Sequence, residues 1–313
     1  MQFNREIVIK MLKIIPLWKL VLCLGTLFST SGVLKFWGIN FNWIYFIYVV
    51  LFSFLTIILA RWLQIRFAFY RERVPLGKNF SILTSAWRKK VEFKPDDAVP
   101  VFNFIMFLTC IVLMIFYLWM AHLIENRFTI NIFLLFLIMT VLIYAYAGSY
   151  RKISWLEEIA DGIITVFTPS IWISAQYAFE ASQLSILSFV LPILCFFLSF
   201  RFVFSMIIVE ENIHFSPGLF VAAIHNKNLR IHHIFPFAAY SIIILTNIMG
   251  VHWRIQWPQF FTIPTIVIQI ILIERILAGK KFEKNILFFL SFANILLLEY
   301  LQTAAIWLNQ SIV

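Results

Sequence analysis

Long apolar runs recur along the whole chain, and they limit what it can fold into more than any other feature. Of its 313 residues, 62% are hydrophobic and 13% are charged. A helix of about 20 apolar residues crosses the roughly 30 Å hydrocarbon core of a bilayer. Hydrocarbon cannot satisfy backbone polar groups, so spanning segments are helices or closed barrels, and long non-alternating runs predict helices. The sequence therefore predicts an all-α, polytopic membrane protein with a single domain over residues 1–313.

The apolar runs predict nine transmembrane helices. They lie near residues 16–37, 42–64, 100–121, 129–147, 158–178, 183–209, 233–250, 257–277 and 285–308. The polar connections that follow the second, fourth and sixth runs are 65–97, 148–157 and 210–232. The other connections are brief, so we expect any polar machinery on the side where these three lie.

The positions of the 25 Lys and Arg residues predict the orientation of the chain. Most of them fall in the N-terminal segment and in the connections on the same side, whereas Lys35, Arg127 and Arg254 fall on the other side. Cytoplasmic loops are enriched in Lys and Arg. The N-terminus and the basic loops are therefore predicted to be cytoplasmic, with the C-terminus on the opposite side. Because topology accounts for the net charge of +10, a nucleic-acid partner is not expected.

The three polar connections carry short patterns of charged and tyrosine residues. The first connection reads Arg71-Glu72-Arg73-Val74-Pro75-Leu76-Gly77-Lys78. The second contains or adjoins Tyr146, Tyr150, Arg151 and Lys152, and is followed by Asp161-Gly162. The third has Glu210, His214 and Gly218 at intervals of four residues. Residues four apart on a helix share one face, so Glu210 and His214 are predicted to flank one point. In these patterns, and in the number and placement of its helices, the chain resembles the UbiA superfamily of intramembrane prenyltransferases.

That resemblance implies nine helices around a central cavity in which an isoprenoid diphosphate binds. It further implies catalytic roles for Tyr146, Tyr150 and Lys152, and diphosphate binding by basic residues. The basic residues are Arg71, Arg73, Lys78 and Arg151, and Arg61 is added because its guanidinium offers several donors that match phosphate oxygens. Glu210 and His214 would be the remaining metal ligands, and Mg²⁺ the implied cofactor, although Mg²⁺ prefers hard oxygen ligands to an imidazole.

The chain departs from the superfamily in its acidic residues. The first connection of the family carries an Asp-rich motif, but here that region holds Arg61, Leu63, Gln64, Phe67 and Ala68. One acidic cluster in place of two predicts at most half of a binuclear Mg²⁺ site. Two functions therefore stay open. The first is transfer of an isoprenoid from its diphosphate to a small or aromatic acceptor. The second is a non-catalytic, lipid-binding or assembly subunit that works beside a membrane partner; a transporter is a more distant third.

Several charged residues have structural alternatives. Arg61 lies at the end of a span, where it either serves a site or extends to the interface. The other basic residues contact lipid headgroups in the alternative reading, and Glu210 is then a solvated carboxylate. For Arg201 and Glu299, each inside a span, we predict interhelical contacts. His225, His232 and His233 are too few for a membrane di-iron site and are predicted to be interfacial.

Overall fold

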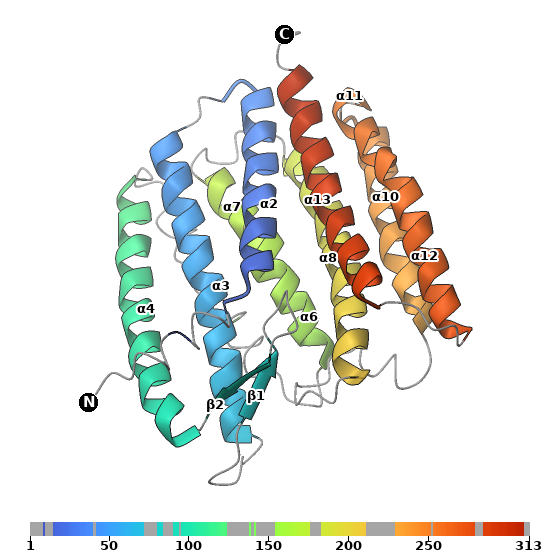
Figure 1. Ribbon diagram of the computed structural model, residues 1–313. Helices are drawn as coiled ribbons and strands as arrows, with labels where there is room; N and C mark the ends of the chain where they lie inside the picture. The colour runs from blue at the N-terminus through green and yellow to red at the C-terminus, as the bar shows by residue number, and fades with distance from the viewer. Residues whose placement is uncertain are drawn as a thin grey trace.

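The computed structural model is a bundle of long helices that run roughly parallel and antiparallel to one another (Figure 1). It describes residues 9, 15–39, 42–71, 80–83, 90–93, 95–123, 138, 141, 154–175, 183–210, 229–251, 253–278 and 284–309. Six helical segments in this part of the chain are long and apolar enough to cross a membrane. The protein is therefore a helical, multi-pass membrane protein, as the apolar runs predict.

The described helices coincide closely with the predicted spans. The first three are α2 (Leu17–Phe36), α3 (Trp43–Arg71) and α4 (Pro95–Leu123). The later ones are α8 (Gln183–Glu210), α10 (Ile234–Ile248), α12 (Ile263–Leu277) and α13 (Lys284–Asn309), with the short α11 (Trp253–Gln256) and the 3₁₀ turns η3 (Leu229–His233) and η4 (Trp257–Thr262) between them. The predicted span at 129–147 lies outside the described residues, apart from Ile138 and Val141, which are helical.

The predicted fifth span is a helix built from three pieces. These are α6 (Ser154–Gly162), the π-helical turn η2 (Ile163–Phe167) and α7 (Thr168–Ala175). The structure also contains an antiparallel hairpin of two strands, β1 (Phe80–Leu83) and β2 (Lys90–Phe93). Phe80 pairs with Phe93, and Leu83 pairs with Lys90. This hairpin falls in the first polar connection, for which the sequence analysis predicts no strand.

Local sequence explains where several helices begin and end. Asn42 precedes α3, and its Oδ1 accepts hydrogen bonds from the backbone amides of Ile44 (3.0 Å) and Tyr45 (3.2 Å), as an N-cap residue does. Gly38 (φ 74°) and Gly250 (φ 103°) follow the ends of α2 and α10 in the left-handed region that favours glycine. Helices α2 and α10 both end at the top of the bundle in Figure 1, where these glycines allow the chain to turn.

The centre of the bundle is formed by α2, α8 and α13. Helix α2 packs against α3, α7, α8 and α13, while α8 also packs against α10 and α13. Helices α4, α10 and α12 lie outside this centre and expose large apolar side chains, such as Phe107 and Phe237. Continuous apolar exposure of this kind is normal only where lipid or another protein covers it. The centre of the bundle therefore contains buried polar side chains, and its outer surface is apolar.

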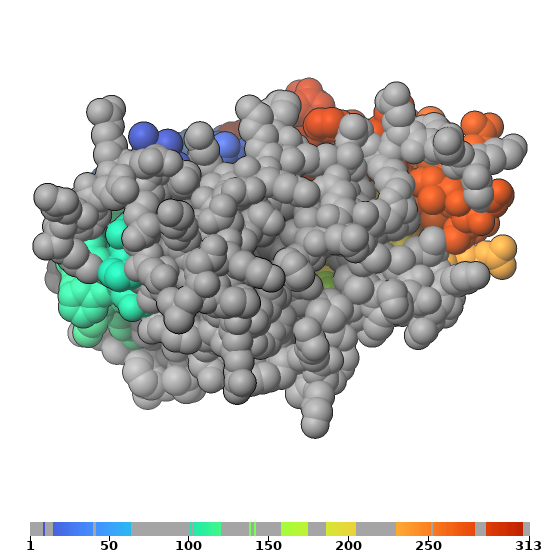
Figure 2. Space-filling model, turned by 60° about the horizontal axis from the view of Figure 1, so that its bottom comes forward, coloured from blue at the N-terminus to red at the C-terminus, as the bar shows by residue number. Residues whose placement is uncertain are grey.

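We call one end of the bundle the lower end, after its position in Figure 1. Helices α3 and α8 finish there, and helices α6 and α13 begin there. The hairpin and η3 also lie there. Figure 2 views this end, and the described side chains visible on it lie mostly at its rim, from α4 on one side and from α10 and α12 on the other. The described helices that flank the three predicted polar connections thus begin or end at one end of the bundle.

Candidate functional site: a buried ionic cluster near the lower end

An ionic cluster inside the bundle joins helices that lie far apart in the sequence. Asp161, the penultimate residue of α6, forms an ion pair with Lys19 Nζ in the first turn of α2 through its Oδ1. Its Oδ2 lies 3.2 Å from Nε of Arg201 in α8. The side chains of Asp161 and Lys19 are 2% and 5% exposed, and that of Arg201 is 10% exposed. One carboxylate therefore holds two cations from two other helices.

Two more charged residues extend this cluster. Arg61 of α3 interacts electrostatically with Lys19, and its Nε is shielded from solvent. Glu158 is buried one turn before Asp161 on the same face of α6. Lys19 and Arg201 thus share the Asp161 carboxylate, and the charge of Arg61 acts on Lys19. Each such charge costs at least about 2.5–3.5 kcal/mol to place in the middle of a bilayer, so partners or an ionic ligand are required.

The backbone next to Asp161 has an unusual form. Directly after Asp161-Gly162 the helix widens into the π-helical turn η2, and Thr168 Oγ1 donates to the carbonyl of Ile163 (2.9 Å) five residues earlier. Turns of this kind are rare and are found frequently at functional sites. A Cβ on Gly162 would lie 2.5 Å from Cδ1 of Leu194 in α8. Glycine therefore permits the close approach of α6 to α8 that brings Asp161 to Arg201.

Aromatic side chains enclose the cluster on the side of the core. The ring of Trp18 packs edge-on against Phe200 with the centroids 4.9 Å apart. Lys19 Nζ lies 5.3 Å from the centre of the Trp18 ring, and Arg201 Cζ lies 5.7 Å from the centre of the Phe204 ring. Cations at such distances from aromatic faces are attracted electrostatically. The cluster therefore lies at a boundary between charged groups and an aromatic interior.

Only one of the predicted site residues has a described side chain, and that residue is Arg61. Arg71 and Glu210 are the last residues of α3 and α8, but their side chains lie outside what the structure describes. The remaining predicted residues also lie outside the described residues: Arg73, Lys78, Tyr146, Tyr150, Arg151, Lys152 and His214. The charge of Arg61 acts on Lys19 of the ionic cluster, and the other assignments stay predictions. Within the described part of the chain, no group of three or more His, Cys, Asp or Glu residues is placed to hold a metal ion.

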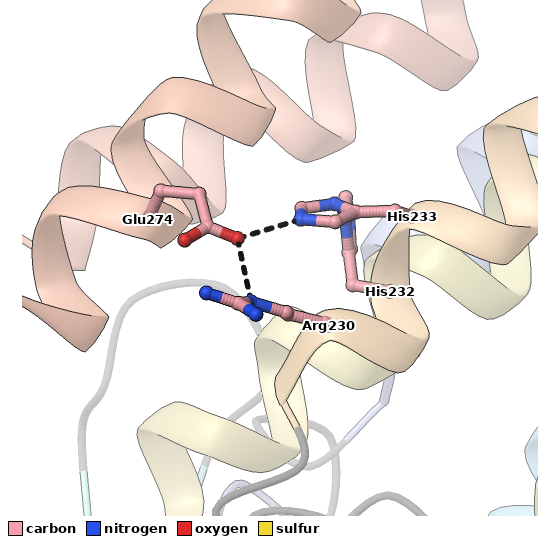
Figure 3. A network of polar contacts seen from close by, with 4 residues as sticks. All are labelled: Arg230, His232, His233 and Glu274. Carbon is pink, nitrogen blue, oxygen red and sulfur yellow. Dashed lines mark hydrogen bonds and ion pairs between the residues drawn. The ribbon is translucent and has the colours of Figure 1, made fainter.

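A second buried polar group lies on another side of α8. Ser199 Oγ and Nε2 of Gln269 lie 2.6 Å and 2.7 Å from Nε2 of His232, and Gln269 Oε1 accepts a hydrogen bond from Asn294. His233 follows His232 in η3, and its Nε2 lies 3.0 Å from Oε1 of Glu274. Figure 3 shows His233 and Arg230 both directed at this carboxylate. His232 is fully buried, whereas His233 is partly exposed, and the location of the histidines at the membrane interface stays a prediction.

A third polar group joins α2 to α13 at mid-bundle. Thr26 Oγ1 donates to Oε1 of Glu299 (2.9 Å), and Ser29 Oγ lies 3.0 Å from Oγ1 of Thr303. A Cβ on Gly25 would lie 2.0 Å from Oε2 of Glu299, so glycine provides the space for this carboxyl group. The interhelical contacts predicted for Arg201 and Glu299 are both present.

Sequence reasoning missed Lys19 and underused Asp161. No sequence pattern singles out Lys19, and Asp161 stands out only as part of the Asp161-Gly162 pair after the second polar connection. An available signal was that both charges fall inside or beside apolar runs, where an ionisable residue needs a partner. Because Lys19 and Asp161 are 142 residues apart in the sequence, their pairing becomes evident only when the helices are packed together.

Compared with known proteins, the chain matches no protein-family model, no curated protein and no solved structure. The resemblance to the UbiA superfamily therefore rests on the sequence patterns alone. The described residues define a helical, multi-pass membrane protein with an ionic cluster buried near one end of its bundle.

Proposed function

We propose that the protein is an intramembrane isoprenoid transferase of the UbiA type, whose diphosphate site consists of cationic side chains in place of Asp-rich motifs. The observation that carries this proposal is the buried ionic cluster of Lys19, Asp161 and Arg201, on whose Lys19 the charge of Arg61 acts. Arg61 is a predicted diphosphate-binding residue, and α3 continues from it to Arg71, another such residue, at the same end. The nine spans and the central cavity of that superfamily are part of the proposal.

The chemistry of prenyl transfer fits a cationic cluster next to an aromatic interior. The C–O bond to the diphosphate breaks, its electron pair leaves with the diphosphate, and the allylic carbon bonds to an acceptor that then loses a proton. Cations fixed where the leaving group gains charge stabilise this transition state. Guanidinium groups such as those of Arg61 and Arg201 match phosphate oxygens with several donors. Aromatic faces such as Trp18 and Phe200 stabilise a developing carbocation.

Mg²⁺ fits the ionic cluster poorly. Its nearest carboxylate, Asp161, already binds two cationic side chains. A hard divalent cation takes oxygen ligands that are free to coordinate it. The proposed diphosphate site therefore works through Lys19, Arg61 and Arg201, and metal binding by Glu210 and His214 stays a prediction from sequence.

The second candidate is a non-catalytic, lipid-binding or assembly subunit. One observation favours it: Asp161 neutralises Lys19 and Arg201 within the protein, as it would in an ion cluster that only fastens α2, α6 and α8 together. The exposed apolar face of α4, including Phe107 and Met114, would then be available to a partner helix or to lipid.

Titration of the full chain in phosphatidylcholine nanodiscs with farnesyl diphosphate tests the proposal. We expect saturable binding that persists in EDTA. The affinity should fall at least about tenfold in Arg61→Gln, which corresponds to a loss of roughly 1.4 kcal/mol of binding free energy. The affinity should be unchanged in Arg254→Gln, because Arg254 is exposed and far from the cluster in sequence. Farnesol and inorganic pyrophosphate, titrated separately, show which half of the ligand is bound. Absence of saturable binding at millimolar ligand overturns the transferase. Saturable binding with no transfer to any phenolic acceptor supports the second candidate instead.

A further inference from the structure

The histidine network in Figure 3 continues into the bundle and has a defined direction. Gln269 Oε1 accepts a hydrogen bond from Nδ2 of Asn294, so the other end of the Gln269 amide, Nε2, is the atom that faces His232. An amide nitrogen only donates. His232 Nε2 must therefore be the acceptor, and the imidazole carries its proton on Nδ1.

That assignment fixes the next residue along the chain. His232 Nδ1 lies 3.5 Å from Nδ1 of His233, and two donors cannot share one contact. His233 therefore accepts at Nδ1 and carries its proton on Nε2, which lies 3.0 Å from Oε1 of Glu274. Arg230 donates to the same oxygen from 3.4 Å. Every hydrogen bond from Asn294 to Glu274 therefore points toward the carboxylate.

The network also joins two different environments. Its outer end is accessible, since the side chain of Arg230 is 76% exposed and that of Glu274 is 39% exposed. At its inner end, Ser199, Gln269 and Asn294 are buried among α8, α12 and α13. Ser199 Oγ accepts from Gln269 Nε2 (3.3 Å) and directs its own proton at Nε2 of His232 (2.6 Å), where it shares the single lone pair with the Gln269 amide in a three-centre hydrogen bond. A buried hydroxyl is thus connected to the protein surface through two imidazoles.

We propose that Ser199, His232, His233 and Glu274 form a proton-transfer chain between the lower end of the bundle and its interior. In one passage, the proton on Ser199 Oγ, or on a hydroxylic ligand that replaces it, moves to His232 Nε2. The Nδ1 proton of His232 moves to His233 Nδ1, and the Nε2 proton of His233 moves to Glu274 Oε1. Three bonds to hydrogen break and three form, which leaves an oxyanion inside and a neutral carboxyl group at the lower end.

The chain is separate from the ionic cluster and does not depend on the proposed function. Arg201 is two residues from Ser199 on α8 but binds Asp161. The other charged groups described on the packed elements are Arg275, which is exposed on α12, and Glu299, which is bonded to Thr26. Arg230 beside Glu274 and the His233 ring are thus the charged or titratable groups that face the exposed end within the described residues.

A purely structural network of interhelical hydrogen bonds makes a different prediction from a proton-transfer chain. When His233 takes up a proton, both its nitrogens become donors, and its Nδ1 proton opposes the Nδ1 proton of His232. In a proton-transfer chain His232 responds by moving its proton to Nε2, and Gln269 turns its oxygen toward it. In a structural network His232 keeps its tautomer, and the contact between the two rings breaks.

The test is nitrogen NMR of the full chain in nanodiscs with ¹⁵N-labelled histidine, assigned with His232→Gln and His233→Gln. At high pH we expect His232 to carry its proton on Nδ1 and His233 on Nε2. As the pH falls, the proton of His232 should move to Nε2 with the same midpoint as the protonation of His233. Gln269→Leu should leave His232 a mixture of tautomers at high pH, whereas the matched variant Gln302→Leu, in another buried glutamine, should not.

Two results would overturn the proposal. One is a His232 that keeps one tautomer throughout the titration of His233. The other is a His232 that carries its proton on Nε2 at high pH in the unmodified protein. Because both are observed in the wild-type chain, a variant that fails to fold does not leave the question open.

Discussion

Two sides of α8 hold buried polar groups in different ways. On one side, Arg201 joins an ionic cluster with Asp161 and Lys19. On the other, Ser199 joins neutral groups, the His232 imidazole and the Gln269 amide. An unpaired charge in a membrane interior costs several times more than an unpaired neutral group. The ionic side therefore tolerates no lost partner, whereas the neutral side can rearrange its protons. We assign ligand binding to the first and proton transfer to the second.

The largest effect is expected from Asp161→Asn, because it leaves Lys19 and Arg201 buried without their carboxylate. The loss in free energy of unfolding should be about 3–5 kcal/mol, measured by SDS or thermal unfolding of the purified protein. The triple variant Lys19→Met, Asp161→Leu, Arg201→Met removes all three charges and should recover most of that stability. A loss below about 1 kcal/mol in Asp161→Asn, the value typical of an exposed pair, would show that the cluster is solvated.

The next effect concerns the contact that positions Asp161. Gly162→Ala places a Cβ 2.5 Å from Cδ1 of Leu194, so either the Leu194 side chain or α6 itself must shift. Overpacking of this kind costs typically about 1–3 kcal/mol. The second substitution Leu194→Ala, made in the same chain, should relieve the clash and recover part of the loss. If the double variant is simply the sum of the two single losses, the two residues do not contact each other.

A smaller effect is expected on the neutral side. Gln269→Leu removes the amide that bonds His232, Ser199 and Asn294. Interhelical hydrogen bonds in membranes contribute about 0.6 kcal/mol on average and up to about 1.7, so a loss of about 1–2 kcal/mol is expected in the same unfolding assay. A loss as large as that of Asp161→Asn would contradict the distinction between the two sides.

The smallest effect should follow Glu299→Gln. The amide oxygen of glutamine can accept from Thr26 as the carboxyl oxygen does, so the change in unfolding free energy should stay below about 1 kcal/mol. Glu299→Leu, which cannot accept, is the matched variant and should cost more. If Glu299→Gln is as damaging as Glu299→Leu, the carboxyl group has a further role in the centre of the bundle.

The sequence predicted the helices well because the length of an apolar run is a local property. The predicted limits of α2, 16–37, and of α13, 285–308, fall within a residue of the observed helices. The π-helical turn after Gly162 could not be predicted, since its apolar residues continue the helical pattern on either side. The hairpin at Phe80–Leu83 and Lys90–Phe93 lies in a segment read only for its charge.

The candidate site was predicted only in part, because its residues meet through packing. Arg61 was selected from its position at the end of an apolar run, where a charge needs a partner or water. Nothing local connects Lys19 with Asp161, which lie 142 positions apart. The direction of the histidine network depends on the orientation of the Gln269 amide, a contact between α12, α13 and η3 that no sequence pattern encodes.

The most direct test of the central claim is to map where an isoprenoid diphosphate binds. A photoreactive farnesyl diphosphate analogue, cross-linked to the full chain in nanodiscs, would be located by peptide mass spectrometry. The account predicts that the analogue labels the first turns of α2 and the last turns of α3 and α6. Unlabelled farnesyl diphosphate should compete with this labelling, and Arg61→Gln should reduce it. Labelling confined to the exposed faces of α4, α10 and α12, without competition, would contradict it.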